Sequence, residues 1–253
     1  SPTEDVTEPK NRIFLNKQKN ISRMLDQLRQ ELQSFARPQK AKILAGFFKT
    51  GRGEYGEGDR FIGVTVPASR KIAKKYSKIS FKDVEALLKS SIHEERLVAL
   101  LILVHQYQTT KNNGIVSFYL RSTKYVNNWD LVDLTAPKIL GAYLLQNPGE
   151  KKTLAQLAQS QSLWEKRIAI VATYEFIKHN QFEETLSIAE YLLKDAHDLI
   201  HKAVGWMLRE VGKRNQAVEE SFLEKHYRTM PRTMLRYAIE RFSEEKRKQY
   251  LQK

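Results

Sequence analysis

The stretch that decides the fold is DLIHKAVGWMLREVGK, residues 198–213. Its apolar residues recur at intervals of three, four and seven, which places them on one face of an α-helix. Similar segments occur before and after it, and their intervals are 36, 35, 35 and 34 residues when they are aligned on Arg96, Val132, Arg167, Lys202 and Arg236. A shorter, more polar helix precedes each one. This period predicts a HEAT-like α-helical repeat.

The predicted fold class is all-α, a solenoid of antiparallel helix pairs whose superhelix has a concave basic groove. Convincing strand alternation is absent, and the chain lacks the fixed small and aromatic positions of a tetratricopeptide array. We expect a disordered lead-in over residues 1–14 and a single solenoid domain over 15–253. Helices are expected at 18–35, 39–48, 67–77, 81–89, 93–108, 115–121, 129–145, 150–158, 163–179, 183–194, 198–213, 216–227 and 232–241.

The charge balance favours a polyanionic partner. Lysine and arginine number 43 against 29 aspartates and glutamates, which gives a net charge of +14. Nucleic acid is the first candidate and an acidic membrane surface the second, because clustered cations neutralise phosphates. No window approaches 18 consecutive apolar residues, so no membrane span is expected. The absence of cysteine excludes a thiol nucleophile and a cysteine-ligated metal site. We expect a monomer in the cytoplasm, associated with the nucleoid if the source is bacterial.

Four of the five aligned repeat positions are basic: Arg96, Arg167, Lys202 and Arg236. If the second helix of each pair lines the groove, these side chains form a row that suits an elongated anionic ligand such as duplex DNA. The alternative is that they lie on solvated helix faces or form ion pairs within the repeat.

A second basic stripe crosses residues 198–213. Lys202, Trp206, Arg209 and Lys213 share a face that differs from the apolar one. Nucleic-acid surfaces combine aromatic and basic side chains in this way, because the first pack on bases or sugars and the second pair with phosphates. The alternative is that Trp206 packs on a neighbouring helix.

The helix expected from residue 129 carries the candidate catalytic group. Trp129 and Asp133 are four residues apart and share a face. A carboxylate in a phosphate-binding groove weakens binding, so its presence there indicates chemistry at Asp133. The alternative is an ordinary aspartate that pairs with Arg96 or Arg167. Asp130 competes for the catalytic role, but its place in the first helical turn favours a structural one.

Three segments, NNWDLVDL (127–134), LWEKRIAIV (163–171) and HKAVGWMLREVGK (201–213), resemble the AlkD-like family of DNA alkylation repair glycosylases. The likeness runs from about residue 40 to the C-terminus. It implies excision of cationic N3- or N7-alkylated adenine or guanine from double-stranded DNA without base flipping. It also implies Trp129, Asp133 and Trp206 at the site, with Arg167 and Arg209 contacting the DNA.

Two features depart from that family. An early-helix aromatic that helps in the family falls on Phe47, where a tyrosine is expected. The loop GRGEYGEGDRF (51–61) is longer than in the best-known members. Its Gly51-x-Gly53-x-x-Gly56 pattern does not follow a strand, so we reject a dinucleotide-binding interpretation in favour of a flexible loop or a phosphate clamp made by backbone amides.

The chemistry implied by the resemblance is physically reasonable. Alkylation at N3 or N7 gives the purine a positive charge, so the base leaves neutral and needs no general acid. A carboxylate such as Asp133 stabilises the oxocarbenium-like sugar, and aromatic faces assist by cation–π attraction. We expect no cofactor and no metal, because His197 and His201 lack a third ligand. Two rival hypotheses are a non-catalytic HEAT-repeat protein that binds damaged or branched DNA, and a protein-binding scaffold.

Overall fold

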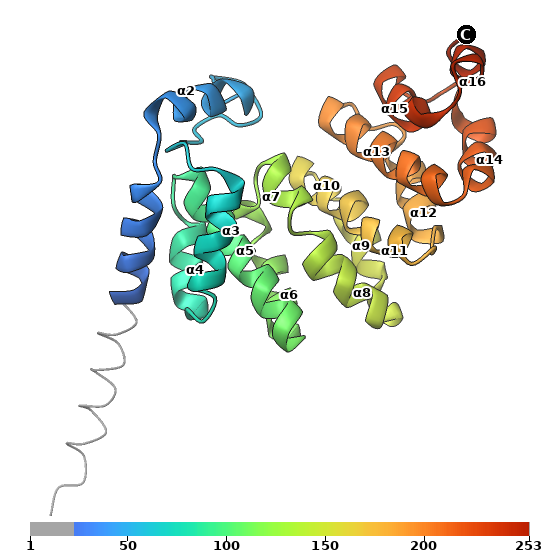
Figure 1. Ribbon diagram of the computed structural model, residues 1–253. Coiled ribbons are helices and arrows are strands. Elements are labelled where there is room, and N and C mark those ends of the chain that lie inside the picture. Colours follow the sequence, from blue (N-terminus) through green and yellow to red (C-terminus); the bar gives the residue numbers. More distant parts are fainter. Residues whose placement is uncertain (1–22, 253) are drawn as a thin grey trace, which may run out of the picture. The chain divides into compact units, whose positions relative to one another are not determined.

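The computed structural model describes residues 23–252, which are almost entirely helical and contain no strand (Figure 1). This confirms the predicted all-α class. The expected lead-in over residues 1–14 lies outside the described residues. The chain divides into two compact units between Thr110 and Lys111, and each unit is considered by itself below. Measured by length and hydropathy, none of the helices within residues 23–252 qualifies as a membrane span.

The first unit is built around one buried helix. Its helical elements are residues 23–34, α2 (Pro38–Phe47), α3 (Val66–Lys75), α4 (Phe81–Leu88) and α5 (His93–Thr110). The α5 helix is apolar on all sides through its middle and is buried from His93 to Val104. Helices α3 and α4 pack on it (Figure 1), and each starts at a hydroxyl cap, Thr65 and Ser80. The core of this unit therefore lies along α5.

The second unit contains the remaining helices, which are mostly short. They are α6 (Asn113–Arg121), η1 (Thr123–Tyr125), α7 (Trp129–Asp133), the π-helical segment η2 (Pro137–Gly141), α8 (Ala142–Gln146), η3 (Pro148–Glu150), α9 (Lys152–Ala158), α10 (Leu163–Ala172), α11 (Tyr174–Lys178), α12 (Glu183–Leu192), α13 (Asp198–Arg214), α14 (Gln216–His226), α15 (Arg232–Ala238), η4 (Ile239–Arg241) and α16 (Glu244–Leu251).

Helix α13 is the centre of the second unit. Its predicted apolar face is fully buried, and α10, α12, α14 and α15 all pack on it. Helix α15 approaches Gly205 tightly, since an added Cβ there would lie 2.5 Å from both the Met234 carbonyl oxygen and the Tyr237 Cβ. Glycine at this position therefore sets the contact between α13 and α15, and with it the position of the adjacent Trp206.

Most predicted helices lie within a few residues of the observed ones, with three differences. The single helix predicted over 129–145 is wrong, because the chain is interrupted around Pro137, which has no N–H to continue the helical hydrogen bonds. The helix predicted over 163–179 is divided at Thr173, whose hydroxyl donates to the Ile170 carbonyl oxygen at 2.6 Å. The last helix, α16, has almost no apolar periodicity and was not predicted.

Candidate functional site

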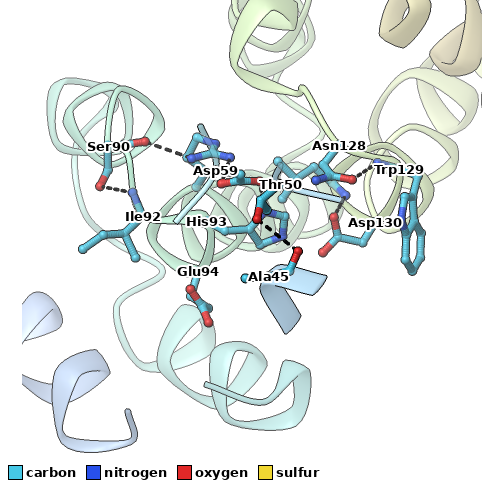
Figure 2. A network of polar contacts seen from close by, with 12 residues as sticks. Ala45, Thr50, Asp59, Ser90, Ile92, His93, Glu94, Asn128, Trp129 and Asp130 are labelled. Atoms are coloured by element: carbon cyan, nitrogen blue, oxygen red, sulfur yellow. Dashed lines mark hydrogen bonds and ion pairs between the residues drawn. The ribbon is translucent and has the colours of Figure 1, made fainter. Parts of the chain in front are cut away.

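Helix α7 is five residues long, and the two side chains predicted to share one of its faces lie at its two ends. Trp129 is its first residue and Asp133 its last. The preceding Asn128 is completely buried and caps the helix, because its Oδ1 accepts the Trp129 N–H at 2.9 Å (Figure 2). Asp130 lies in the first turn, where its Oδ1 accepts the Leu131 N–H at 2.8 Å. This contact agrees with a structural role for Asp130.

The chain leaves regular α-helical geometry directly after Asp133. The Thr135 N–H donates to the Val132 carbonyl, and the Thr135 hydroxyl satisfies the Leu131 carbonyl at 2.5 Å. The Tyr119 hydroxyl, 3.0 Å from that Thr135 oxygen, donates to it because the single threonine hydrogen is already used. These buried bonds fix the helix break that places Asp133 at the half-buried end of α7.

The Asp133 carboxylate makes a two-point contact with Arg167 on α10. Arg167 Nε donates to Oδ1 at 2.9 Å and Nη2 donates to Oδ2 at 2.8 Å. The side chain of Asp133 is 16% exposed and that of Arg167 is 6% exposed. Parallel N–H···O bonds to both oxygens require the ionised carboxylate and fix its orientation. Asp133 is therefore a charged group with a fixed orientation, and one edge of its carboxylate is still exposed to solvent.

Arg167 also connects three helices of this unit. Its Nη1 donates to the Leu199 carbonyl oxygen at 2.6 Å, at the start of α13. Helix α10 packs on both α7 and α13, so the guanidinium group lies where these elements meet. The Arg167 side chain thus links Asp133, through hydrogen bonds, to α13, the helix that carries Trp206.

Burial and charge act in opposite directions on Asp133. Burial raises the pKa of Asp133, and the nearby Asp130 raises it further, whereas the charge and hydrogen bonds of Arg167 lower it. The net direction is upward from the ordinary value. Without Arg167, the same burial would act unopposed, so this arginine is what keeps the carboxylate ionised.

Trp206 is half-buried and is held by two neighbours. Its Nε1 donates to Glu210 Oε1 at 3.2 Å. Its ring lies 6.0 Å from the ring of Tyr174 on α11, centroid to centroid. Trp206 therefore packs on a neighbouring helix while part of the indole remains accessible. Trp129 is also half-buried.

The predicted phosphate-binding cations on α13 lie at the surface beside acidic side chains. Lys202 pairs with Asp198 at 2.7 Å, Lys213 with Glu210 at 2.7 Å, and Arg209 with Glu240. A bound phosphate would have to replace these carboxylates as partner. The exposed Lys202–Asp198 pair contributes little to stability, so the exchange is energetically accessible there, whereas the side chains of Arg209 and Glu210 are only 19% and 12% exposed.

The aligned basic positions do not form an exposed row in this structure. Arg96 and Arg167 are both buried, and each pairs with an aspartate. Arg236 is exposed and Lys202 half-buried. The prediction of an exposed row is wrong at Arg96 and Arg167. Both guanidinium groups are buried in the helical core, where an ion pair with an aspartate compensates their charge. This outcome matches the alternative of ion pairs within the repeat.

Comparison with known proteins shows the family of the chain. A family model described as DNA alkylation repair enzyme matches residues 28–242. The chain belongs to this family. A solved structure from Enterococcus faecalis, described as a predicted DNA alkylation repair enzyme, is similar with a TM-score of 0.68 and 19% identity, covering 83% of this chain and 97% of that chain. At 19% identity, this similarity shows only that the two proteins share a fold. No functionally curated protein matches the chain.

In this DNA alkylation repair family member, the first unit holds a polar cluster that sequence patterns did not reveal. The buried Asp59 carboxylate bonds His93 Nδ1 and Arg96 Nη2, each at 2.7 Å (Figure 2). Burial alone would raise the pKa of Asp59, but the hydrogen bonds and charges of His93 and Arg96 lower it. Arg96 also donates to the Ser90 carbonyl oxygen at 3.0 Å. In this structure Arg96 anchors the loop that contains Asp59.

Backbone amides at the tip of the glycine-rich loop, and of the residues that follow the loop, have carboxylate partners. Glu94 accepts the N–H groups of residues 62–64, with the shortest bond, to Gly63, at 2.8 Å. At the tip, the amides of Gly51 and Gly53 donate to Glu54 and Glu57. Because those two amides already have carboxylate partners, the structure does not support the phosphate clamp.

The two histidines of the HDLIH segment have structural partners. His197 caps α13, since its Nδ1 accepts the Leu199 N–H at 3.1 Å, and His201 contacts the Asp195 carbonyl oxygen. Within residues 23–252, no group of three histidine or acidic side chains is arranged to hold a metal ion.

Proposed function

We propose that this member of the DNA alkylation repair enzyme family is a monofunctional DNA glycosylase. Its substrates would be purines that alkylation at N3 or N7 has made cationic, in double-stranded DNA. The observation that carries the proposal is the Asp133 carboxylate, ionised and fixed by Arg167 at the end of α7, in a unit that also contains the half-buried Trp129 and Trp206.

The reaction needs charge stabilisation more than acid catalysis. An N-alkylated purine already carries a positive charge, so the glycosidic electron pair moves onto the base, which leaves neutral. Positive charge then develops on the deoxyribose. A fixed carboxylate stabilises that charge without reorganising during the reaction. Water completes the hydrolysis by adding to the anomeric carbon, and its proton passes to solvent or transiently to Asp133.

Arg167 is a positioning residue in this proposal. It occupies one acceptor direction on each Asp133 oxygen, which leaves the other lone pairs available to a sugar or a water on the exposed edge. Its charge keeps Asp133 ionised despite burial. The guanidinium group that the sequence assigned to DNA phosphates is therefore better suited to hold the catalytic carboxylate.

The remaining proposed contacts lie around this centre. Trp129 and Trp206 would pack on the sugar and backbone of the damaged nucleotide and add cation–π attraction to the developing charge. Lys202, Arg209 and Lys213 would bind phosphates after exchanging their acidic partners. We infer that the base is captured without being flipped into a pocket.

The test is release of base from duplex DNA that contains N7-methylguanine, measured under single-turnover conditions. We expect release by the wild-type protein and a rate about a hundredfold lower for Asp133→Asn, with DNA binding kept or strengthened. Asp130→Asn is the matched control, because an amide oxygen can still accept the Leu131 N–H.

Two results would contradict the proposal. Equal release rates for wild type and Asp133→Asn would assign Asp133 to a structural ion pair. The absence of release above the spontaneous rate on N7-methylguanine and N3-methyladenine, with tight and salt-sensitive binding, would instead favour a non-catalytic protein that binds damaged or branched DNA.

A further inference from the structure

Helix α2, in the first unit, has none of its ten residues buried. Ile43 is 70% exposed and Phe47 61% exposed. These residues are four apart, so they share one face of the helix. The opposite side, with Ala41 and Ala45, faces the rest of the unit. Together the two side chains form a contiguous exposed apolar patch, and such a patch with a polar rim marks an interaction surface.

Both ends of α2 are fixed to the first unit. At its start, the Arg37 N–H donates to the Ile62 carbonyl at 2.9 Å, and an added Cβ on Gly63 would lie 2.8 Å from the Ala41 nitrogen. Residues 62–64 are in turn held by Glu94. A helix anchored in this way presents its outer face rigidly, which limits the conformational entropy lost on binding.

The C-terminal end of α2 is anchored by aromatic stacking. Phe48 is buried, its ring stacks on Phe61 at 4.9 Å, and Phe61 stacks on His93 at 4.4 Å. The Phe47 ring meets Phe48 edge to face at 5.3 Å. The exposed phenylalanine therefore rests on a buried aromatic stack, which fixes the direction in which it projects.

The segment that contains this face carries charges of one sign. Residues 37–53 contain five cations and no acidic residue: Arg37, Lys40, Lys42, Lys49 and Arg52. All except the half-buried Lys40 are exposed. This contrasts with α13, whose surface cations have acidic partners. The surrounding charge is complementary to a polyanion, and the centre of the face is complementary to an apolar or aromatic surface.

We propose that α2 contacts the minor groove of duplex DNA and inserts the Ile43 and Phe47 side chains at a base step. Minor-groove proteins use apolar wedges with flanking lysines and arginines to unstack a step partially. The cations of residues 37–53 would bind the flanking phosphates. This inference rests on the proposed DNA-directed function, and it gives Phe47, at which the resemblance expects a helpful aromatic, the specific role of deforming the duplex.

A duplex fits this surface better than an anionic membrane does. Membrane binding by an amphipathic helix increases with the apolar area that it buries, and here two side chains supply that area. A partially unstacked base step exposes apolar base faces between which two such side chains can insert.

The experiment uses lesion-free duplexes in which 2-aminopurine occupies each position in turn, since its fluorescence rises when it unstacks. Wild-type protein is expected to raise the signal at one or two adjacent positions. Phe47→Ala is expected to abolish that rise and to weaken binding about tenfold, and Ile43→Ala to reduce both. Lys42→Ala should keep the rise and lower the salt dependence of binding by about one phosphate contact.

Two controls separate this proposal from the glycosylase reaction. Tyr191→Ala removes another exposed aromatic, 56% exposed, from a helix outside the first unit and should keep the rise. Asp133→Asn should also keep the rise on these lesion-free duplexes, although it should lose base release from duplexes that contain N7-methylguanine. A wild-type rise on lesion-free DNA, without base release from the N7-methylguanine and N3-methyladenine duplexes, would overturn the glycosylase proposal alone.

Other outcomes would overturn the α2 proposal alone. One is the absence of any rise with wild type despite tight DNA binding. Another is an equal rise with Phe47→Ala. Binding to vesicles of anionic phospholipid that depends on Phe47, without a fluorescence change on DNA, would make α2 a membrane-contacting helix. Self-association that Ile43→Ala abolishes would make it a contact between copies of the chain.

Discussion

Replacing Arg167 with methionine isolates the buried carboxylate of Asp133. Methionine keeps much of the aliphatic volume but removes three donated hydrogen bonds, two to Asp133 and one to the Leu199 carbonyl oxygen. Removing one partner of a buried ion pair costs about 3–5 kcal/mol, because the other charge stays buried without compensation. Asp133 is 16% exposed, so we expect a loss of about 3 kcal/mol at neutral pH.

The loss should depend on pH in a defined direction. Without Arg167, burial raises the pKa of Asp133 further above its unfolded value of about 4. The unfolded state then ionises first as the pH rises, so the stability of the variant falls with increasing pH. The difference from wild type should grow by at most about 1.4 kcal/mol per pH unit, between the raised pKa of Asp133 in the folded wild type and its still higher pKa in the folded variant.

Base release by the same variant should show the opposite trend. Because only the ionised carboxylate stabilises the sugar cation, the single-turnover rate of Arg167→Met should rise over the pH range in which its stability falls. Urea unfolding and base release would be measured from pH 5 to pH 8, with Asp133→Asn/Arg167→Met as control. A stability loss and a rate that are both independent of pH would refute the assignment of Arg167 as the residue that keeps Asp133 ionised.

Two further predictions concern α13 and its neighbour α14. Gly205→Ala should destabilise the fold by about 1–3 kcal/mol in thermal unfolding, because its Cβ would meet the Met234 carbonyl oxygen and Tyr237 on α15; unchanged stability would show that α15 can shift. Burial raises the pKa of Glu219 to about 9, so wild-type stability should fall as the pH rises from 5 to 9, whereas Glu219→Gln should not show this slope. Parallel slopes for both proteins would contradict the neutral state of that carboxyl group.

The helical framework could be predicted from sequence because apolar periodicity is a local signal. Helix α13 shows this well, since its stripe of apolar residues is the buried face. The interruption after Asp133 could have been anticipated from Pro137, which is incompatible with a continuous helix.

The ion pairs could not be predicted, because their partners are distant in the chain. Spacing showed that Arg96 and Arg167 occupy equivalent repeat positions, but burial depends on Asp59 and Asp133, which lie 37 and 34 residues away. The hydrogen bonds of Glu94 to a loop 30 to 32 residues earlier are equally non-local. The spacing did leave pairing of Asp133 with Arg167 as an open alternative, and the structure selects it.

The central claim is that Asp133 stabilises positive charge on the sugar, and a cationic sugar analogue tests it most directly. Duplex DNA would carry either a pyrrolidine, positively charged at neutral pH, or an uncharged tetrahydrofuran at the abasic position. We predict that wild type binds the cationic duplex at least about tenfold more tightly and that Asp133→Asn loses this preference. Equal wild-type affinity for the two duplexes would contradict the account.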